Sequence, residues 1–236
     1  FLSANSINPI KLYMKKIWSI ISVILVVLAV VFKVIIYSKE KQELANLRQS
    51  DEEGNADAQS NLGDLYFSGK RVSANKAEAT KWYLKAAEQG DARAQLNLGY
   101  LYSSGEGIPK DEAEGEKWYR KSAENGNADA QKSIGLMYYK GMGVPKDDTE
   151  AVKWFSKAAE QGDAEGQRFL ATMYYLGSGV SVDYVAAYMW CNLALTQGEE
   201  HAKIGIGEIS AEMTEEQIAE AQNLSREWMA KHSERQ

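Results

Sequence analysis

Hydrophobic and polar positions in the middle of the chain follow a pattern that repeats every 36 residues. Self-similarity at a fixed period of this length is the signature of a repeat protein, in which each unit is one supersecondary element. The pattern predicts four units, at 55–90, 91–126, 127–162 and 163–198. The residues that keep the period are Trp82, Trp118, Trp154 and Trp190; Gln59, Gln95, Gln131 and Gln167; Tyr66, Tyr102, Tyr138 and Tyr174; and Gly90, Gly126, Gly162 and Gly198.

Within each unit, the spacing of apolar residues predicts two helices. In the first unit, Ala58, Leu62 and Leu65 form one helical stripe, and Trp82 and Ala86 belong to a second. The glycine that recurs every 36 residues follows the second predicted helix. It suits the C-terminus of that helix, because glycine readily adopts the left-handed conformation found there. A side chain suited to N-capping precedes every predicted helix: Asn55, Asn75, Asp91, Asp111, Asn127, Asp147, Asp163 and Asp183.

A glycine also recurs inside the first predicted helix, at Gly63, Gly99 and Gly135, with Ala171 in the fourth unit. Glycine in a helix interior costs about 1 kcal/mol relative to alanine. Its recurrence therefore predicts that another helix approaches closely at this point.

These motifs together resemble the Sel-one-like repeat family, a relative of the tetratricopeptide repeat. The matching signature is Ala-x-Ala-Gln, Leu-Gly, Tyr, Gly-x-Gly-Val, Asp and Trp-Tyr-x-Lys-Ala-Ala-Glu-x-Gly, and it covers 55–198. The resemblance implies an all-α fold, an α-solenoid in which antiparallel helix pairs form a right-handed superhelix. It also implies a scaffold that binds other proteins.

An apolar run of 21 residues occupies 17–37, interrupted only by Lys33. This length predicts a transmembrane helix, and no small-x-small cleavage site follows it, which favours an uncleaved signal anchor. The alternative is a secreted protein released after signal cleavage. Residues 1–16 would form a basic N-terminal tail.

The expected location follows from this span and from the resemblance. Basic residues before and after the span are equal in number, so the positive-inside rule does not decide its orientation. The pair Lys15-Lys16 directly before the apolar run favours a cytoplasmic N-terminus, as in export signals. We therefore predict a single-pass protein of the inner membrane, with membrane contact through 17–37 and the repeats in the bacterial periplasm. The alternative orientation places the repeats in the cytoplasm.

Segments on either side of the repeats complete the predicted organisation. Residues 38–54 are expected to form a linker helix or half a repeat. Residues 199–236 are expected to form a degenerate half repeat and a capping helix that starts near Glu215. Met189 and Leu193 stand where the earlier units have lysines, which predicts that the capping helix covers them.

Charge excludes one class of partner. The chain has a formal net charge of −6, but residues 1–49 carry seven basic and two acidic side chains, so 50–236 carry 20 basic and 31 acidic ones. An acidic repeat domain repels phosphate backbones, so we expect no nucleic-acid binding.

Motifs with catalytic potential are sparse, and we predict no enzyme, no metal and no cofactor. His201 and His232 lack partners at metal-ligand spacing. The one cysteine, Cys191, replaces an aromatic residue of the repeat and is expected to be a small buried side chain. Ser73 and Lys76 match the Ser-x-x-Lys motif of penicillin-recognising enzymes without its companion motifs. A periplasmic hydrolase related to β-lactamases, as described for cysteine-rich members of the resembled family, is the alternative function.

Specificity in a repeat protein comes from exposed positions that differ between units. On the first helices such positions give one aromatic residue per unit, and aromatic side chains are favoured anchors for protein ligands. The alternative is that these rings pack between neighbouring first helices. We expect a protein or peptide partner, with the oligomeric state left open, to contact Asp64, Phe67, Tyr100, Leu136, Tyr139, Thr172 and Tyr175.

Overall fold

A computed structural model of the chain describes residues 9–70 and 72–233. These residues form eleven α-helices and no strand, which confirms the predicted all-α class. The chain divides into two compact units, 1–53 and 54–236. The helices are α1 (Pro9–Glu52), α2 (Ala56–Ser68), α3 (Lys76–Glu88), α4 (Ala92–Ser104), α5 (Glu112–Glu124), α6 (Ala128–Lys140), α7 (Asp148–Glu160), α8 (Ala164–Leu176), α9 (Tyr184–Thr196), α10 (Glu200–Ser210) and α11 (Glu215–Ser233).

The prediction that 17–37 crosses a membrane is wrong. Across the described residues, none of the helices combines the length and the apolar character that a membrane span requires. The apolar run does not form a helix of its own, because α1 continues from it into the charged segment that begins at Lys39. The membrane contact, the single-pass inner-membrane location and the periplasmic placement were inferred from this span, and they are corrected with it. Side chains at 17, 19–23 and 37 lie outside the described residues, as do residues 1–8 of the predicted tail.

Helices α2 to α9 begin where the sequence predicts. Each has 13 residues, and each is preceded by an asparagine or aspartate whose side chain accepts a hydrogen bond from the third backbone N–H of the helix. At Asn55, for example, Oδ1 accepts from the N–H of Ala58 at 2.9 Å. The N-caps are confirmed because capping depends only on neighbouring residues.

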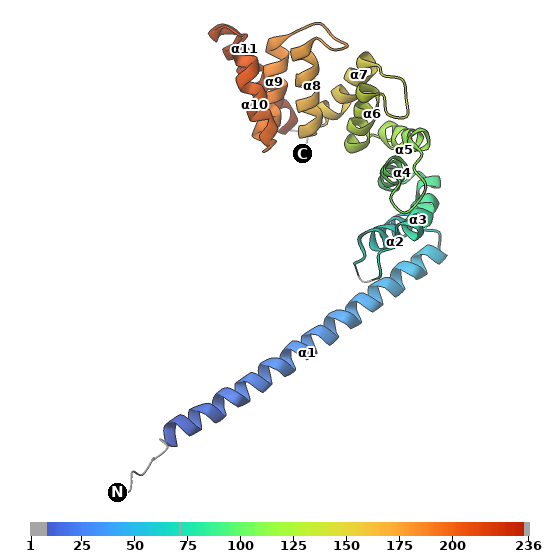
Figure 1. Ribbon diagram of the computed structural model, residues 1–236, viewed down its shortest axis with the longest axis vertical. Helices are drawn as coiled ribbons and strands as arrows, with labels where there is room; N and C mark the ends of the chain where they lie inside the picture. Colours follow the sequence, from blue (N-terminus) through green and yellow to red (C-terminus); the bar gives the residue numbers. More distant parts are fainter. Residues whose placement is uncertain (1–8, 71, 234–236) are drawn as a thin grey trace. The chain divides into compact units, whose positions relative to one another are not determined.

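Helices α2 to α9 form four antiparallel pairs that follow one another in chain order (Figure 1). Each pair packs against the next through its second helix, as α3 does against α4. First helices of successive units also touch each other, as α2 touches α4 and α8 touches α10. At the C-terminus, α11 packs against α9. We call the exposed surface of α2, α4, α6, α8 and α10 the inner face.

The recurring glutamines join the second helix of the preceding unit to the residue that ends the second helix of their own unit. The side-chain amide of Gln95 donates to the carbonyl of Ala87 at 3.1 Å, and its carbonyl accepts from Asn125 at 3.0 Å. Gln131 and Gln167 make the equivalent bonds in the later units. A buried amide costs free energy unless it is hydrogen-bonded, so glutamine recurs because its length reaches both partners.

The recurring glycines confirm the predicted close approach between helices. A Cβ added to Gly135 would lie 2.6 Å from the ring of Phe155, and one added to Gly99 would lie 2.5 Å from the ring of Tyr119. In the fourth unit, alanine replaces the glycine at 171 and Cys191 replaces the ring. The residue at the glycine position and the residue at the ring position therefore change together in this unit, because their side chains pack against each other.

Substituting Gly135 by alanine is expected to lower the free energy of unfolding by about 1 to 3 kcal/mol, since overpacking against Phe155 outweighs the gain in helix propensity. Gly207, in α10, is the matched control because a Cβ there would meet no atom within 4 Å. Gly207→Ala is expected to stabilise the protein by about 0.5 to 1 kcal/mol. Denaturant unfolding measures both changes. Equal stabilisation by the two substitutions would contradict the close packing at Gly135.

Candidate protein-binding face

Asp64, a predicted contact residue, forms its polar contacts with side chains of the repeat domain itself. Its Oδ1 accepts a hydrogen bond from the hydroxyl of Tyr83 at 2.7 Å, and its Oδ2 lies 3.1 Å from the guanidinium of Arg93. Burial and the hydrogen bond to Asp64 raise the pKa of Tyr83 above its ordinary value. This carboxylate therefore serves to join the first two units, and sequence reasoning missed its partners because they lie on other helices.

Phe67 and Tyr100 form an edge-to-face pair across the first two units, with ring centroids 6.1 Å apart. The Lys76 ammonium lies 5.3 Å from the Phe67 ring centroid. The hydroxyl of Tyr100 donates to Oε1 of Glu106 at 2.7 Å, while 41% of the residue's surface stays exposed. Tyr100 is thus fixed in place and still accessible.

The rings of Tyr139 and Tyr175 contact residues of their own units and stay partly exposed. The Lys146 ammonium lies 5.5 Å from the Tyr139 centroid, and the ring of Tyr184 lies 5.9 Å from that of Tyr175. Thr172 donates its hydroxyl to the carbonyl of Arg168 at 3.0 Å. The aromatic stripe therefore combines packing within the domain with surface that a partner can reach.

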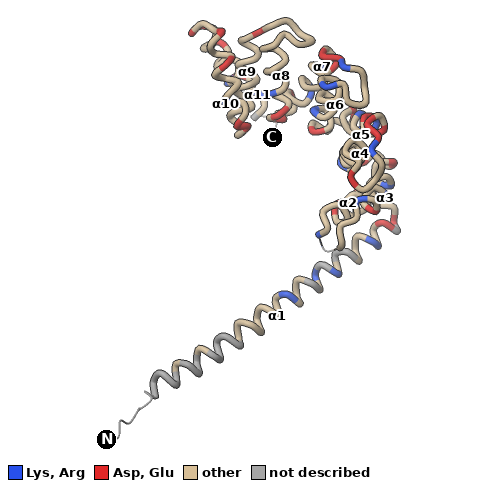
Figure 2. The backbone as a smooth tube through the Cα atoms, viewed as in Figure 1, with Lys and Arg blue, Asp and Glu red and all other residues tan. Residues whose placement is uncertain are grey.

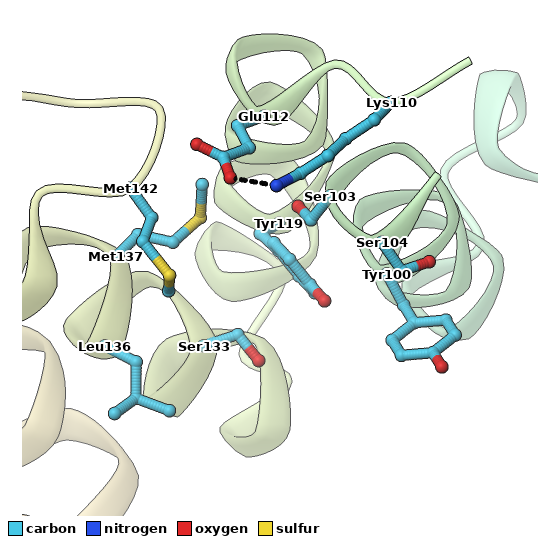
Figure 3. Close-up of a pocket in the computed structure, with 10 residues that line it drawn as sticks. All are labelled: Tyr100, Ser103, Ser104, Lys110, Glu112, Tyr119, Ser133, Leu136, Met137 and Met142. Atoms are coloured by element: carbon cyan, nitrogen blue, oxygen red, sulfur yellow. Dashed lines mark ion pairs between the residues drawn. The ribbon is translucent and has the colours of Figure 1, made fainter. Parts of the chain in front are cut away.

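A cavity of about 320 Å³ opens on the inner face between α4, α5 and α6 (Figure 3). We call it the α4–α6 pocket. The Lys110–Glu112 ion pair, 2.6 Å long, lies at one side, with Ser133 and Leu136 on the opposite side in this view. Of the predicted contact residues, Tyr100 and Leu136 meet here. The full lining is Tyr100, Ser103, Ser104, Lys110, Glu112, Tyr119, Ser133, Leu136, Met137 and Met142.

Tyr119 and Ser103 were not predicted as contact residues. Tyr119 is a buried ring that forms one wall of the α4–α6 pocket, and burial raises the pKa of its hydroxyl to about 12. The hydroxyl is therefore protonated at neutral pH. Ser103 could have been found from the sequence, because it stands where the other three units have an aromatic residue.

A second cavity, of about 350 Å³, lies between α8, α9 and α10, and Thr172 and Tyr175 contribute to its lining. Cys191 lies at this cavity with 2% of its surface exposed, and its Sγ donates to the carbonyl of Ala202 at 3.1 Å. Burial raises the pKa of the thiol to about 11. The prediction of a small buried side chain is confirmed by this low exposure.

Charged side chains on the inner face form ion pairs both within and between units. Lys132 contacts Glu165 at 2.7 Å and Asp129 at 3.0 Å, and Arg168 lies 3.2 Å from Glu199. Burial opposes the charge on Lys132, but the hydrogen bonds to the two carboxylates outweigh it and raise the pKa of the ammonium group. Figure 2 shows acidic and basic positions interspersed along α2 to α7.

Comparison with known protein families identifies the four repeat units. The Sel1 repeat matches residues 56–91, 92–127, 128–163 and 164–199. The chain belongs to the Sel1 repeat family. No curated protein matches it.

Two solved structures illustrate the similarity of the Sel1 repeats. The first is a protective antigen of uropathogenic Escherichia coli strains with an SLR fold; it is 37% identical, with a TM-score of 0.73 over 79% of this chain and 40% of the antigen. The second is a Sel1 repeat protein from Oxalobacter formigenes, also 37% identical, with a TM-score of 0.67 over 74% of this chain and 73% of the other. The chain thus spans less than half of the first relative.

Sel1 repeat proteins are scaffolds for protein interaction and are in general not enzymes. In this Sel1 protein, Lys76 of the Ser-x-x-Lys motif forms an ion pair with Glu106. His201 lies 2.9 Å from Glu199, and His232 stacks on Trp228 with centroids 3.7 Å apart. Within the described ranges, no three metal-ligating side chains form a group.

Proposed function

We propose that this Sel1 repeat protein binds a protein partner on its inner face. The observation that supports the proposal is that the two cavities described above are lined by predicted contact residues: Tyr100 and Leu136 in one, Thr172 and Tyr175 in the other. These positions differ between units, whereas the glutamines, glycines and tryptophans that recur are used for packing. Differences on an exposed face give a repeat scaffold its specificity.

Site-specific photocrosslinking tests which face binds. A photoreactive phenylalanine analogue is placed in the full chain at Tyr100 or Leu176, both exposed on the inner face. Matched controls carry it at Lys117 or Lys153, exposed on the second helices. Adducts with one discrete partner are expected from the inner positions only. Equal adducts from all four positions, or adducts from the controls alone, would contradict the proposal.

Replacing Tyr100 and Tyr139 together by alanine is expected to weaken binding of the crosslinked partner by at least about 2 kcal/mol, the scale of an interface hot spot. Unfolding in denaturant must be measured beside affinity, because both rings also contact neighbouring side chains. An unchanged affinity, or a loss that matches the unfolded fraction, would exclude these rings as anchors.

A further inference from the structure

The second unit lacks a ring that the other three units place on the inner face. Phe67, Tyr139 and Tyr175 occupy the last turn of the first helix in units one, three and four, and unit two has Ser103 there. Each of these rings packs against a core cluster that its own unit shares with the segment that follows it. The core residue 34 positions further along is Leu101 for Phe67, Met173 for Tyr139 and Ile209 for Tyr175.

Met137 is the corresponding core residue for unit two, and it receives no ring from position 103. The α4–α6 pocket is found at this place, with both Ser103 and Met137 in its lining. Its volume of about 320 Å³ falls within the range of small-ligand sites. Tyr119, Leu136 and Met142 supply apolar walls that would shield a ring from water.

Ser103 is accommodated in a way that leaves the space open. Its hydroxyl faces Gly115 of α5, where a Cβ would collide with it. The other units have alanine at this position: Ala79, Ala151 and Ala187. Unit two therefore departs from the repeat at Ser103 and at Gly115, and the missing Cβ of Gly115 makes room for the Ser103 hydroxyl. Neither residue fills the space of the missing ring.

Unit two nevertheless keeps the ion pair that lies beside the aromatic ring of unit three. In unit three, Lys146 lies over the Tyr139 ring at 5.5 Å and pairs with Asp148 at 3.3 Å. The equivalent residues of unit two, Lys110 and Glu112, form the same ion pair at the edge of the pocket. An ammonium group complements the electron-rich face of an aromatic ring. The charge complementarity thus favours an aromatic occupant over an aliphatic one.

We propose that the α4–α6 pocket receives one aromatic side chain, phenylalanine or tyrosine, of the bound partner. The ring takes the place that Phe67, Tyr139 and Tyr175 fill in the other units. This assignment rests on the proposed function and specifies the partner: a protein that presents an exposed aromatic residue to the inner face.

The test uses N-acetyl-tyrosinamide as a probe for the pocket, with N-acetyl-leucinamide as the aliphatic control. Both are titrated into the full chain with 13C-labelled methionine methyl groups, and the signals of Met137 and Met142 are followed by NMR. The tyrosine derivative is expected to shift both signals saturably and to bind at least about tenfold more tightly than the leucine derivative, a difference of about 1.4 kcal/mol. Equal binding of the two derivatives would overturn the proposal.

Variants at two equivalent positions make the test specific. Ser103→Tyr supplies the ring from within the chain and is expected to weaken probe binding at least about tenfold, whereas Ser103→Ala leaves the space open and keeps the affinity within about twofold. Tyr139→Ser removes the ring of unit three and is expected to create a second probe site, which keeps the proposal testable if Ser103→Tyr folds poorly. Unchanged binding in Ser103→Tyr that folds normally, or no second site in Tyr139→Ser, would overturn it.

The two proposals fail in different ways. Partner crosslinks from the inner face that persist undiminished in Ser103→Tyr would overturn the aromatic pocket and leave the inner-face function standing. Crosslinks from the control positions alone would contradict the inner-face function, whatever the probe does.

Discussion

Replacing Trp154 by alanine is expected to lower the free energy of unfolding by about 3 to 5 kcal/mol, the usual cost of removing a large aromatic side chain from a packed site. Trp154 is 4% exposed and belongs to the core that units two and three share, together with Tyr119, Ile134 and Met137. The Lys157 ammonium lies 3.8 Å from its ring centroid. The substitution leaves a cavity between two units, and neighbours on α5, α6 and α7 cannot all move to fill it.

A matched control separates the ring from its N–H group. The indole Nε1 of Trp154 is buried without a hydrogen-bond partner among the described residues. Trp154→Phe keeps a ring and removes this unsatisfied donor, so it is expected to cost less than about 1.5 kcal/mol. Denaturant unfolding measures both variants. Normal stability of Trp154→Ala combined with lost partner binding would show that the recurring tryptophans belong to the binding surface.

Deleting residues 214–236 is expected to destabilise the C-terminal end of the repeats and to cause self-association. The deletion removes α11, which packs against α9 and whose Ser225 hydroxyl donates to the carbonyl of Met189 at 3.3 Å. Leu193 on α9 is 1% exposed. Exposing this side chain alone costs about 1.5 to 3 kcal/mol, and an uncovered end of a solenoid is an apolar patch. Light scattering at several concentrations and denaturant unfolding measure the two effects.

Two lysines provide the control for this deletion. Units one to three have lysine at the positions of Met189 and Leu193. Met189→Lys with Leu193→Lys is expected to restore a monomer in the truncated chain, and to destabilise the full chain because α11 then buries two charges. A truncated chain that is already monomeric and as stable as the full chain would mean that α11 does not act as a cap.

Local features of this protein were predictable to within a residue. N-caps such as Asn55 and Asp91 act on the next three residues, so their effect depends only on neighbouring sequence. The repeat boundaries were predictable from the 36-residue period, because similar units pack on one another and keep the same spacing of packing residues. The family match begins each unit one residue later than the predicted boundary.

The candidate site was predictable only in part. Asp64 was assigned to ligand contact, but Tyr83 and Arg93 use its carboxylate, and these partners come from two other helices. The pockets were missed because a small side chain leaves a cavity only where neighbouring side chains do not fill the space. Those neighbours lie far apart in the sequence.

The sequence by itself determined the all-α class, the 36-residue period, the helix starts and the close contact of the recurring glycines with another helix, because each depends on short-range spacing. It also led to a membrane span that the described helices do not support. Only the tertiary structure decided which polar groups are internally paired and where the inner face is hollow. Ser103 and Met137, which line the α4–α6 pocket, come from α4 and α6, and Gly115, which makes room for the Ser103 hydroxyl, comes from α5. The pocket exists because folding brings the position that lacks a ring next to a core residue of another helix.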